Sequence, residues 1–182
     1  SGDHFLAPVK PGKIVCVGRN YRAHAAELGN EVPTTPLIFL KPPTAVAGPQ
    51  DWIERPAASE QVEHEAELGL IIGQWIRDDT VEAARAAVFG LTCVNDVTAR
   101  DIQRAEGKFT RAKGFDSFCP VGPHITTGVD PLDLEVRCTV NGQERQKGRT
   151  SQMVFDPYQL VLFIHSVMTL EPGDLILTGT PA

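Results

Sequence analysis

The chain of 182 residues lacks the features that mark several large classes of protein. Its longest apolar run near the end, 160–164, stops at His165 and is much too short to span a bilayer. The first residues lack the charged segment and apolar stretch of a secretory signal, so we expect a cytoplasmic protein with no membrane partner. The formal net charge of −6 argues against nucleic acid or an anionic membrane surface as the main partner.

Cysteine is scarce and shows no metal-binding or redox spacing. The four cysteines form no C-x-x-C pair and mostly lie in apolar runs that read as core: Cys16, Cys93, Cys119 and Cys138. Reduced thiols in a cytosolic protein are the expected state. No cluster of cysteine and histidine stands out either, which disfavours a zinc site.

Linkers, repeats and low-complexity tracts are absent as well. With a hydrophobic content of 42%, residues 1–182 are expected to form one compact domain with a sizeable core. Apolar runs predict strands at 13–18, 37–40 and 175–178, and Asn141-Gly142 predicts the turn of a hairpin. Many strands with few short helices, and no βαβαβ alternation, predict an α+β or mainly β roll.

Helices are expected in four places, each with a capping signal at its start. They are 21–28, 81–89, 98 to about 106, and 157–168. The capping residues are Asn20, Asp79 with Glu82, Thr98 with Asp101, and Asp156 with Gln159.

What the sequence does contain is a concentration of acidic side chains beside an apolar run. Glu65 and Glu67 directly precede the run 68–72, and alternation along a strand would aim both carboxylates at one face. An isolated pair of this kind more often lies on a solvated edge, but the apolar continuation makes exposure of both harder. Two bare anions this close near a core are not tolerated, so a divalent cation is the simplest remedy.

Asp96, at the end of the apolar run 89–95, is the candidate third ligand. Three carboxylates form a hard, oxygen-rich donor set, which favours Mg²⁺, Mn²⁺ or Ca²⁺ over zinc. We expect Mg²⁺. Carboxylate oxygens that point apart, or that arginines engage in place of an ion, would contradict this assignment.

Five blocks occur in order along nearly the whole chain. They are 18–21 with His24 and Glu27, Glu65-x-Glu67, 95–101, 112–116 and 178–181. Together they resemble the fumarylacetoacetate hydrolase family, above all its short single-domain members. The resemblance implies a mixed β-sandwich roll of the family's C-terminal-domain type, a single catalytic domain over 1–182, a homodimer, and further strands beyond Ala182.

The resemblance also implies roles for individual residues. Glu65, Glu67 and Asp96 match the metal ligands, Lys113 matches the site lysine, and His24 with Glu27 matches a catalytic dyad on a mobile lid. The positions that match substrate contacts are Arg19, Tyr21, Arg100, Gln103 and Thr180. Without the resemblance, His24 and Glu27 read as a surface ion pair, Lys113 reads as a solvated lysine, and Arg100 reads equally as a surface contact.

The implied activity is cleavage of a C–C bond in a small 2-oxo acid, by acylpyruvate hydrolysis or oxaloacetate decarboxylation, through a metal-bound enolate. The sequence does not choose between these, because both use the same electron sink. The alternative is an isomerase or decarboxylase of 2-oxo-dienedioates from aromatic catabolism. A third, non-enzymatic alternative is a dimeric β protein whose acidic site holds calcium for stability.

Overall fold

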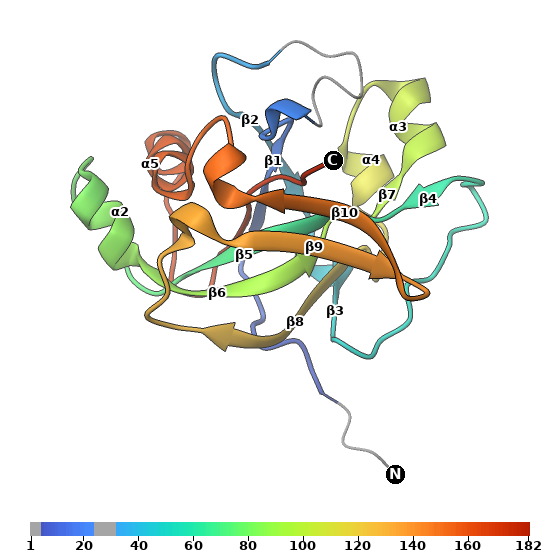
Figure 1. Cartoon of the computed structure of the whole chain (residues 1–182), viewed down its shortest axis with the longest axis horizontal. Helices are drawn as coiled ribbons and strands as arrows, with labels where there is room; N and C mark the ends of the chain where they lie inside the picture. The colour runs from blue at the N-terminus through green and yellow to red at the C-terminus, as the bar shows by residue number, and fades with distance from the viewer. Residues whose placement is uncertain (1–4, 24–31) are drawn as a thin grey trace.

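A curled, mixed sheet of seven strands forms the centre of the computed structural model, which describes residues 5–23 and 32–182 (Figure 1). The strand order is β2-β1-β11-β5-β6-β8-β3. Their bounds are β1 Ile14–Gly18, β2 Leu37–Lys41, β3 Val46–Ala47, β5 Ala66–Ile72, β6 Val88–Asn95, β8 Cys119–Thr126 and β11 Leu175–Leu177. The predicted mainly β roll is therefore confirmed.

Two small antiparallel sheets complete the β structure. One pairs β4 (Val62–Glu63) with β7 (Thr98–Ala99), and the other is the hairpin of β9 (Glu135–Val140) and β10 (Gln143–Arg149). Asn141 and Gly142 have φ of 53° and 76°, the left-handed backbone that a tight two-residue hairpin turn requires. The predicted hairpin is thus confirmed.

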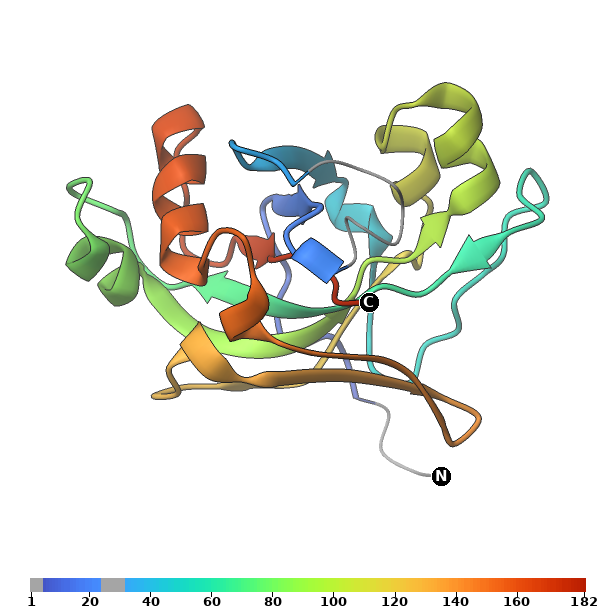
Figure 2. The same ribbon diagram turned by 45° about the horizontal axis from the view of Figure 1, so that its top comes forward.

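Four short α-helices are described, at the two ends of the central sheet (Figure 2). α2 (Val81–Ala87) and α5 (Pro157–Val167) lie at one end, and α3 (Arg100–Glu106) and α4 (Thr110–Lys113) lie at the other. There are also three 3-10 turns, η1 (Pro43–Ala45), η2 (Pro131–Asp133) and η3 (Thr150–Gln152). Among the described residues, no helix has the length and apolar character that crossing a bilayer requires.

The helix predictions have mixed outcomes. α5 begins as predicted, with the Asp156 side chain accepting from the backbone of Tyr158 and Gln159. α2 ends two residues before the predicted 89, because Val88 already belongs to β6 and pairs there with Ile72 of β5. The residue that caps its start is Thr80 and not the predicted Asp79. The predicted helix 21–28 lies mostly outside the described residues.

The predicted cap at Thr98 is wrong. α3 begins at Arg100, after Ala99, and no side chain caps it. Thr98 is buried in β7, where its hydroxyl donates to the Asp96 carbonyl and accepts from the Lys113 ammonium group. A buried tertiary contact has therefore taken the hydroxyl that local sequence assigns to a helix end.

The two faces of the central sheet carry separate clusters of apolar side chains. On one face, Leu68, Leu70 and Ile72 of β5 pack with residues of α2, α5 and β9. On the other face, Ile71 packs with Val94 and with side chains of β1, β8 and β11. Because neighbours along a strand point to opposite faces, Glu65 and Glu67 share the side of Ile71. The acidic residues therefore lie at the edge of the second cluster.

Candidate functional site

Three carboxylates meet where β5 begins and β6 ends. Glu65 immediately precedes β5, Glu67 is its second residue, and Asp96 follows the last residue of β6. One oxygen of each lies within 4.8 Å of the others, and the residues are only 7%, 3% and 1% exposed. The convergence expected from the sequence is therefore present. Below, these residues are called the acidic trio.

Lys113 binds two members of the acidic trio from α4. Its Nζ lies 2.9 Å from Glu65 Oε2, 2.6 Å from Asp96 Oδ2 and 2.8 Å from Thr98 Oγ1. Burial opposes the charge of Lys113, but the carboxylates of Asp96 and Glu65 together raise its pKa above the usual value. The solvated lysine that this local sequence alone would predict is excluded.

A second buried lysine, which the sequence reasoning missed, reaches the acidic trio from β2. Lys41 is 2% exposed, and its Nζ lies 2.6 Å from Asp96 Oδ1 and 3.2 Å from the Val97 carbonyl oxygen. Burial of Asp96 opposes its ionisation, but the charges of Lys113 and Lys41 lower its pKa. The available signal was alternation, because Lys41 has the same parity along the strand as Phe39, which packs in the second cluster.

Arg100, the first residue of α3, is the third cation of this network and binds Glu65. Its Nη2 donates to Glu65 Oε1 at 2.6 Å, its Nε to Glu63 Oε2 at 2.8 Å, and its Nη1 to Gln103 Oε1 at 2.6 Å. The guanidinium is mostly buried and its ion pairs are with Glu63 and Glu65, so the alternative of a surface contact with Arg104 or Glu106 is wrong. An arginine bound to a carboxylate of the acidic trio is one of the two observations that would count against a metal, and Arg100 does bind Glu65. The other, oxygens that point apart, is not observed, because the three oxygens converge.

Glu67 differs from the other two carboxylates. Among the described residues, no lysine or arginine forms an ion pair with it, and its Oε2 accepts from the Gly179 N–H at 2.6 Å. Burial, reinforced by the charges of Asp96 and Glu65, raises the pKa of Glu67 well above its ordinary value. The acidic trio therefore has one carboxylate whose negative charge is poorly compensated.

Tyr21 brings an unused donor to the same region. It is 2% exposed, it forms an isolated β-bridge with Met153, and its hydroxyl has no hydrogen-bond partner within residues 5–23 and 32–182. Burial, with the charge of Glu67 adding to it, raises the pKa of Tyr21. The phenol therefore keeps its proton and can donate it in a hydrogen bond.

The remaining predicted site residues have different positions. Thr180 is buried beside β5, with its hydroxyl donating to the Ala66 carbonyl at 2.8 Å. Arg19 is exposed, has a φ of 58°, and contacts none of the three carboxylates. His24 and Glu27 lie outside the described residues, so their predicted roles stay predictions.

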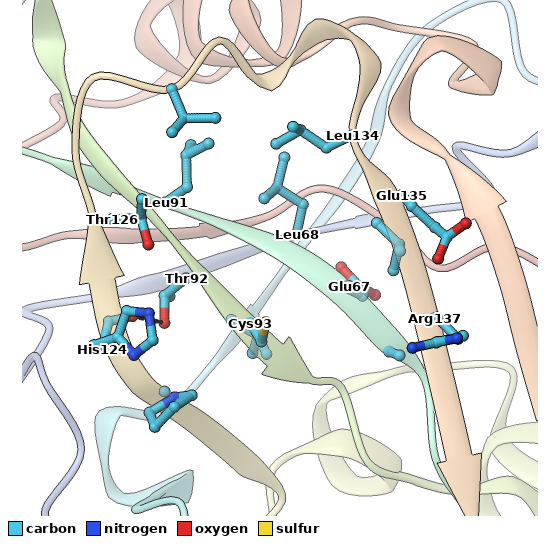
Figure 3. A pocket seen from close by; sticks show the side chains of 16 residues that line it. Glu67, Leu68, Leu91, Thr92, Cys93, His124, Thr126, Leu134, Glu135 and Arg137 are labelled. Atoms are coloured by element: carbon cyan, nitrogen blue, oxygen red, sulfur yellow. Dashed lines mark hydrogen bonds between the residues drawn. The ribbon is translucent and has the colours of Figure 1, made fainter.

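A separate groove opens between β8 and β9, with a volume of about 490 Å³ (Figure 3). Leu68, Leu91 and Cys93 project into it from β5 and β6, and His124 and Thr126 flank it from β8. Glu67 is the one member of the acidic trio that lines it; Glu65 and Asp96 do not. The lining of the groove is mostly apolar, unlike the surroundings of the acidic trio.

Two observations show that the acidic trio suits a divalent cation. Its donors are all carboxylate oxygens, the ligands preferred by hard cations such as Mg²⁺. In addition, burial and the charges of Asp96 and Glu65 disfavour the ionised form of Glu67 and raise its pKa, and a bound cation would offset this. Glu65, Glu67 and Asp96 are thus a candidate metal centre.

A mainly β roll with a buried acidic centre at its strand ends defines the class of this protein. The chain belongs to the family described as fumarylacetoacetate (FAA) hydrolase C-terminal, whose pattern matches residues 13–182. The resemblance seen in the sequence is thereby confirmed.

Relatives and solved structures with similar sequences are named for several different activities. The mitochondrial oxaloacetate decarboxylase of Dictyostelium discoideum is 47% identical, over 93% of this chain and 81% of its own length. The mitochondrial oxaloacetate tautomerase of Bos taurus is 43% identical, over 97% of this chain and 58% of its own. The structure of a 5-carboxymethyl-2-hydroxymuconate delta-isomerase from Mycobacterium smegmatis is 50% identical, with a TM-score of 0.90 over 98% of this chain and 71% of its own.

Proposed function

We propose that the protein is a divalent-metal-dependent enzyme that cleaves a C–C bond in a small 2-oxo acid, with oxaloacetate decarboxylation or acylpyruvate hydrolysis as the reaction. The observation that carries this proposal is the convergence of Glu65, Glu67 and Asp96 beside two buried lysines. The relative named oxaloacetate decarboxylase, at 47% identity, supports it.

The acidic trio would hold the metal, which we propose to be Mg²⁺, with Mn²⁺ and Ca²⁺ as alternatives that the same oxygens accept. When bound, such an ion draws electron density from the 2-oxo group and the adjacent carboxylate of the substrate.

The charges around the acidic trio support an anionic substrate. Four carboxylates, those of the acidic trio and of Glu63, face three cations, Lys41, Lys113 and Arg100, so the formal sum is −1. A divalent cation would therefore leave one positive charge in the site. The carboxylate of an oxo acid balances it, whereas a neutral substrate does not.

Lys113 and Arg100 act from fixed positions. The three hydrogens of the Lys113 ammonium group match its three contacts with Glu65, Asp96 and Thr98, so it orients the carboxylates and contributes a fixed positive charge where negative charge develops. Arg100 is likewise engaged with Glu63, Glu65 and Gln103. Tyr21, whose hydroxyl has no hydrogen-bond partner among the described residues, is a candidate donor to a substrate oxygen.

Water activation in the hydrolytic reaction is assigned to His24 and Glu27, as the resemblance implies. In this proposal Glu27 fixes the imidazole tautomer, so that the free ring nitrogen takes a proton from the attacking water. Decarboxylation needs no attacking water, and the pair then orients the lid or returns the proton. A cytoplasmic homodimer remains part of the proposal.

A second candidate is isomerisation of a 2-oxo-dienedioate, in which a proton leaves one carbon and is returned to another, and no C–C bond is cleaved. It is favoured by the 50% identity to two solved structures, those of a 5-carboxymethyl-2-hydroxymuconate delta-isomerase and of a 2-hydroxyhepta-2,4-diene-1,7-dioate isomerase. Cleavage and isomerisation both draw electron density toward the 2-oxo group, so the same metal centre would serve either reaction.

The test is a screen of acylpyruvates, oxaloacetate and oxo-dienedioates with added Mg²⁺, followed by mass spectrometry. Cleavage gives products of lower mass, whereas isomerisation leaves the mass unchanged and shifts the ultraviolet absorbance. For variants that remove a carboxylate of the acidic trio, the control is Glu144→Ala, which removes an exposed glutamate of the hairpin. Turnover that persists after full removal of divalent ions would overturn the metal-dependent proposal. A protein that unfolds when the ions are removed, and that turns over none of the substrates, would instead favour a structural calcium site.

A further inference from the structure

Gln146, on β10, uses the whole hydrogen-bonding capacity of its amide inside the protein. Its Nε2 donates to Thr180 Oγ1 and to the Pro181 carbonyl oxygen, both at 2.8 Å. Its Oε1 accepts from the Ala66 N–H at 2.9 Å and lies 3.0 Å from His64 Nδ1. A glutamine amide has two donor hydrogens and two acceptor positions, so nothing is left over for solvent.

The burial of Gln146 depends on an irregularity in the hairpin. Its neighbours Arg145 and Lys147 are exposed, whereas Gln146 is only 8% exposed. The pairing of β9 with β10 shifts register between Glu144 and Gln146, as at a β-bulge, and such a bulge re-aims the side chain that follows it. The hairpin is thus shaped to send one amide toward the start of β5.

The peptide that Gln146 holds lies between two members of the acidic trio. Strand pairing of β5 with β11 covers Gly69 to Ile71, and Thr178 continues it with two hydrogen bonds to the Leu68 carbonyl oxygen. At Ala66, side chains bind the β5 backbone in place of a neighbouring strand. The Ala66 N–H donates to Gln146, and the Ala66 carbonyl accepts from Thr180.

We propose that Gln146 is a positioning residue of the metal centre. It touches no carboxylate of the acidic trio, but it fixes the Ala66 peptide and so the relative placement of Glu65 and Glu67. Through Thr180 and Pro181 it also holds the turn whose Gly179 N–H donates to Glu67. This inference rests on the proposed function, because it assigns Gln146 to the metal that the acidic trio would hold.

The variant that tests it is Gln146→Met, which keeps the length of the side chain and removes all four hydrogen bonds. Gln143→Met is the matched control, because Gln143 is an exposed glutamine of the same strand. The affinity for Mn²⁺ alone is measured by calorimetry without substrate, and kcat and KM are then measured at saturating metal.

Loss of a residue that orients metal ligands typically weakens metal affinity about 10–100-fold, and this is the loss expected for Gln146→Met. Gln143→Met should bind Mn²⁺ as the wild type does. A residue with only a structural role would lower the melting temperature and leave the Mn²⁺ affinity of the folded protein unchanged.

If Gln146→Met does not fold, Gln146→Asn decides the question, because its shorter amide cannot reach Ala66 and the Thr180 turn together. Weakened Mn²⁺ binding by a folded Gln146 variant supports the inference, and wild-type affinity in such a variant overturns it. A wild-type protein that binds no Mn²⁺ overturns the proposed function and this inference with it. The two failures are thus distinguished by the wild-type measurement.

Discussion

The two ends of β5 have opposite kinds of surroundings. Its start carries Glu65 and Glu67 among buried charges, whereas Leu70 and Ile72 at its far end lie in a wholly apolar cluster. Apolar packing adds stability without any need for partners, whereas every buried charge must be matched or it costs free energy. One strand therefore combines an apolar, stabilising half with a half whose buried charges need partners.

The largest effect is expected from Glu67→Ala, at the charged end. Removing this carboxylate takes away one of three predicted ligands, so Mg²⁺-dependent turnover should fall by more than about a hundredfold. Stability should stay within about 1–2 kcal/mol of the wild type, because relief from repulsion by Asp96 and Glu65 offsets the lost bond from Gly179. Kinetics with Mg²⁺ and urea unfolding check both parts. Retained activity would contradict the ligand assignment.

Lys41→Met should be the most destabilising change at the charged end. It leaves Asp96 buried with Lys113 as its one remaining lysine, and loss of one partner of a buried ion pair costs about 3–5 kcal/mol. Lys147→Met, at a pair 3.7 Å long whose lysine is half exposed, should cost less than about 1 kcal/mol. Urea unfolding of the two variants tests this contrast, and equal losses would refute it.

Leu70→Ala probes the apolar end of the same strand. Leu70 is fully buried, so truncation should cost about 2–5 kcal/mol through lost burial and the cavity that remains. Turnover per folded molecule should be nearly unchanged, because Leu70 belongs to the cluster on the face opposite the acidic trio. Activity measured well below the melting temperature provides the check. A large fall in kcat would show that the two ends of β5 are not independent.

The smallest effect is expected at Asp101, outside both ends. Its carboxylate accepts from Ser59 Oγ at 2.6 Å and from the Glu60 N–H at 2.9 Å, and these bonds lower its pKa from 3.8 to about 2. A lowered folded-state pKa stabilises the fold above the unfolded value of 3.8, and this stabilisation is lost as the pH falls through 2. Asp101→Asn should therefore be less stable at neutral pH, with the difference vanishing near pH 2. Unfolding across this pH range measures it.

Local signals predicted those parts of the fold that depend on neighbours in sequence. Asn141-Gly142 fixed the hairpin turn, and Asp156 with Gln159 fixed the start of α5, because both motifs form their hydrogen bonds within a few residues. Alternation along β5 predicted the convergence of Glu65 with Glu67. Their role in holding a metal remains a prediction.

The remainder of the site depends on contacts that are distant in sequence. Lys41 reads locally as the exposed end of a strand, and its partner Asp96 lies 55 residues further along. Gln146 reads as one of several exposed polar residues in a strand, and only the register shift beside it turns it inward. Thr98 resembles a cap until Lys113 is seen to bind it. Such residues are recognised only when the partner strands are in place.

The four thiols differ in a way that offers a chemical handle. Cys16 and Cys119 are buried, and burial raises the pKa of both, that of Cys119 to about 12. Cys93 is exposed and lines the groove between β8 and β9. A maleimide dye should therefore modify Cys93 first and report, through its fluorescence, on whatever enters that groove.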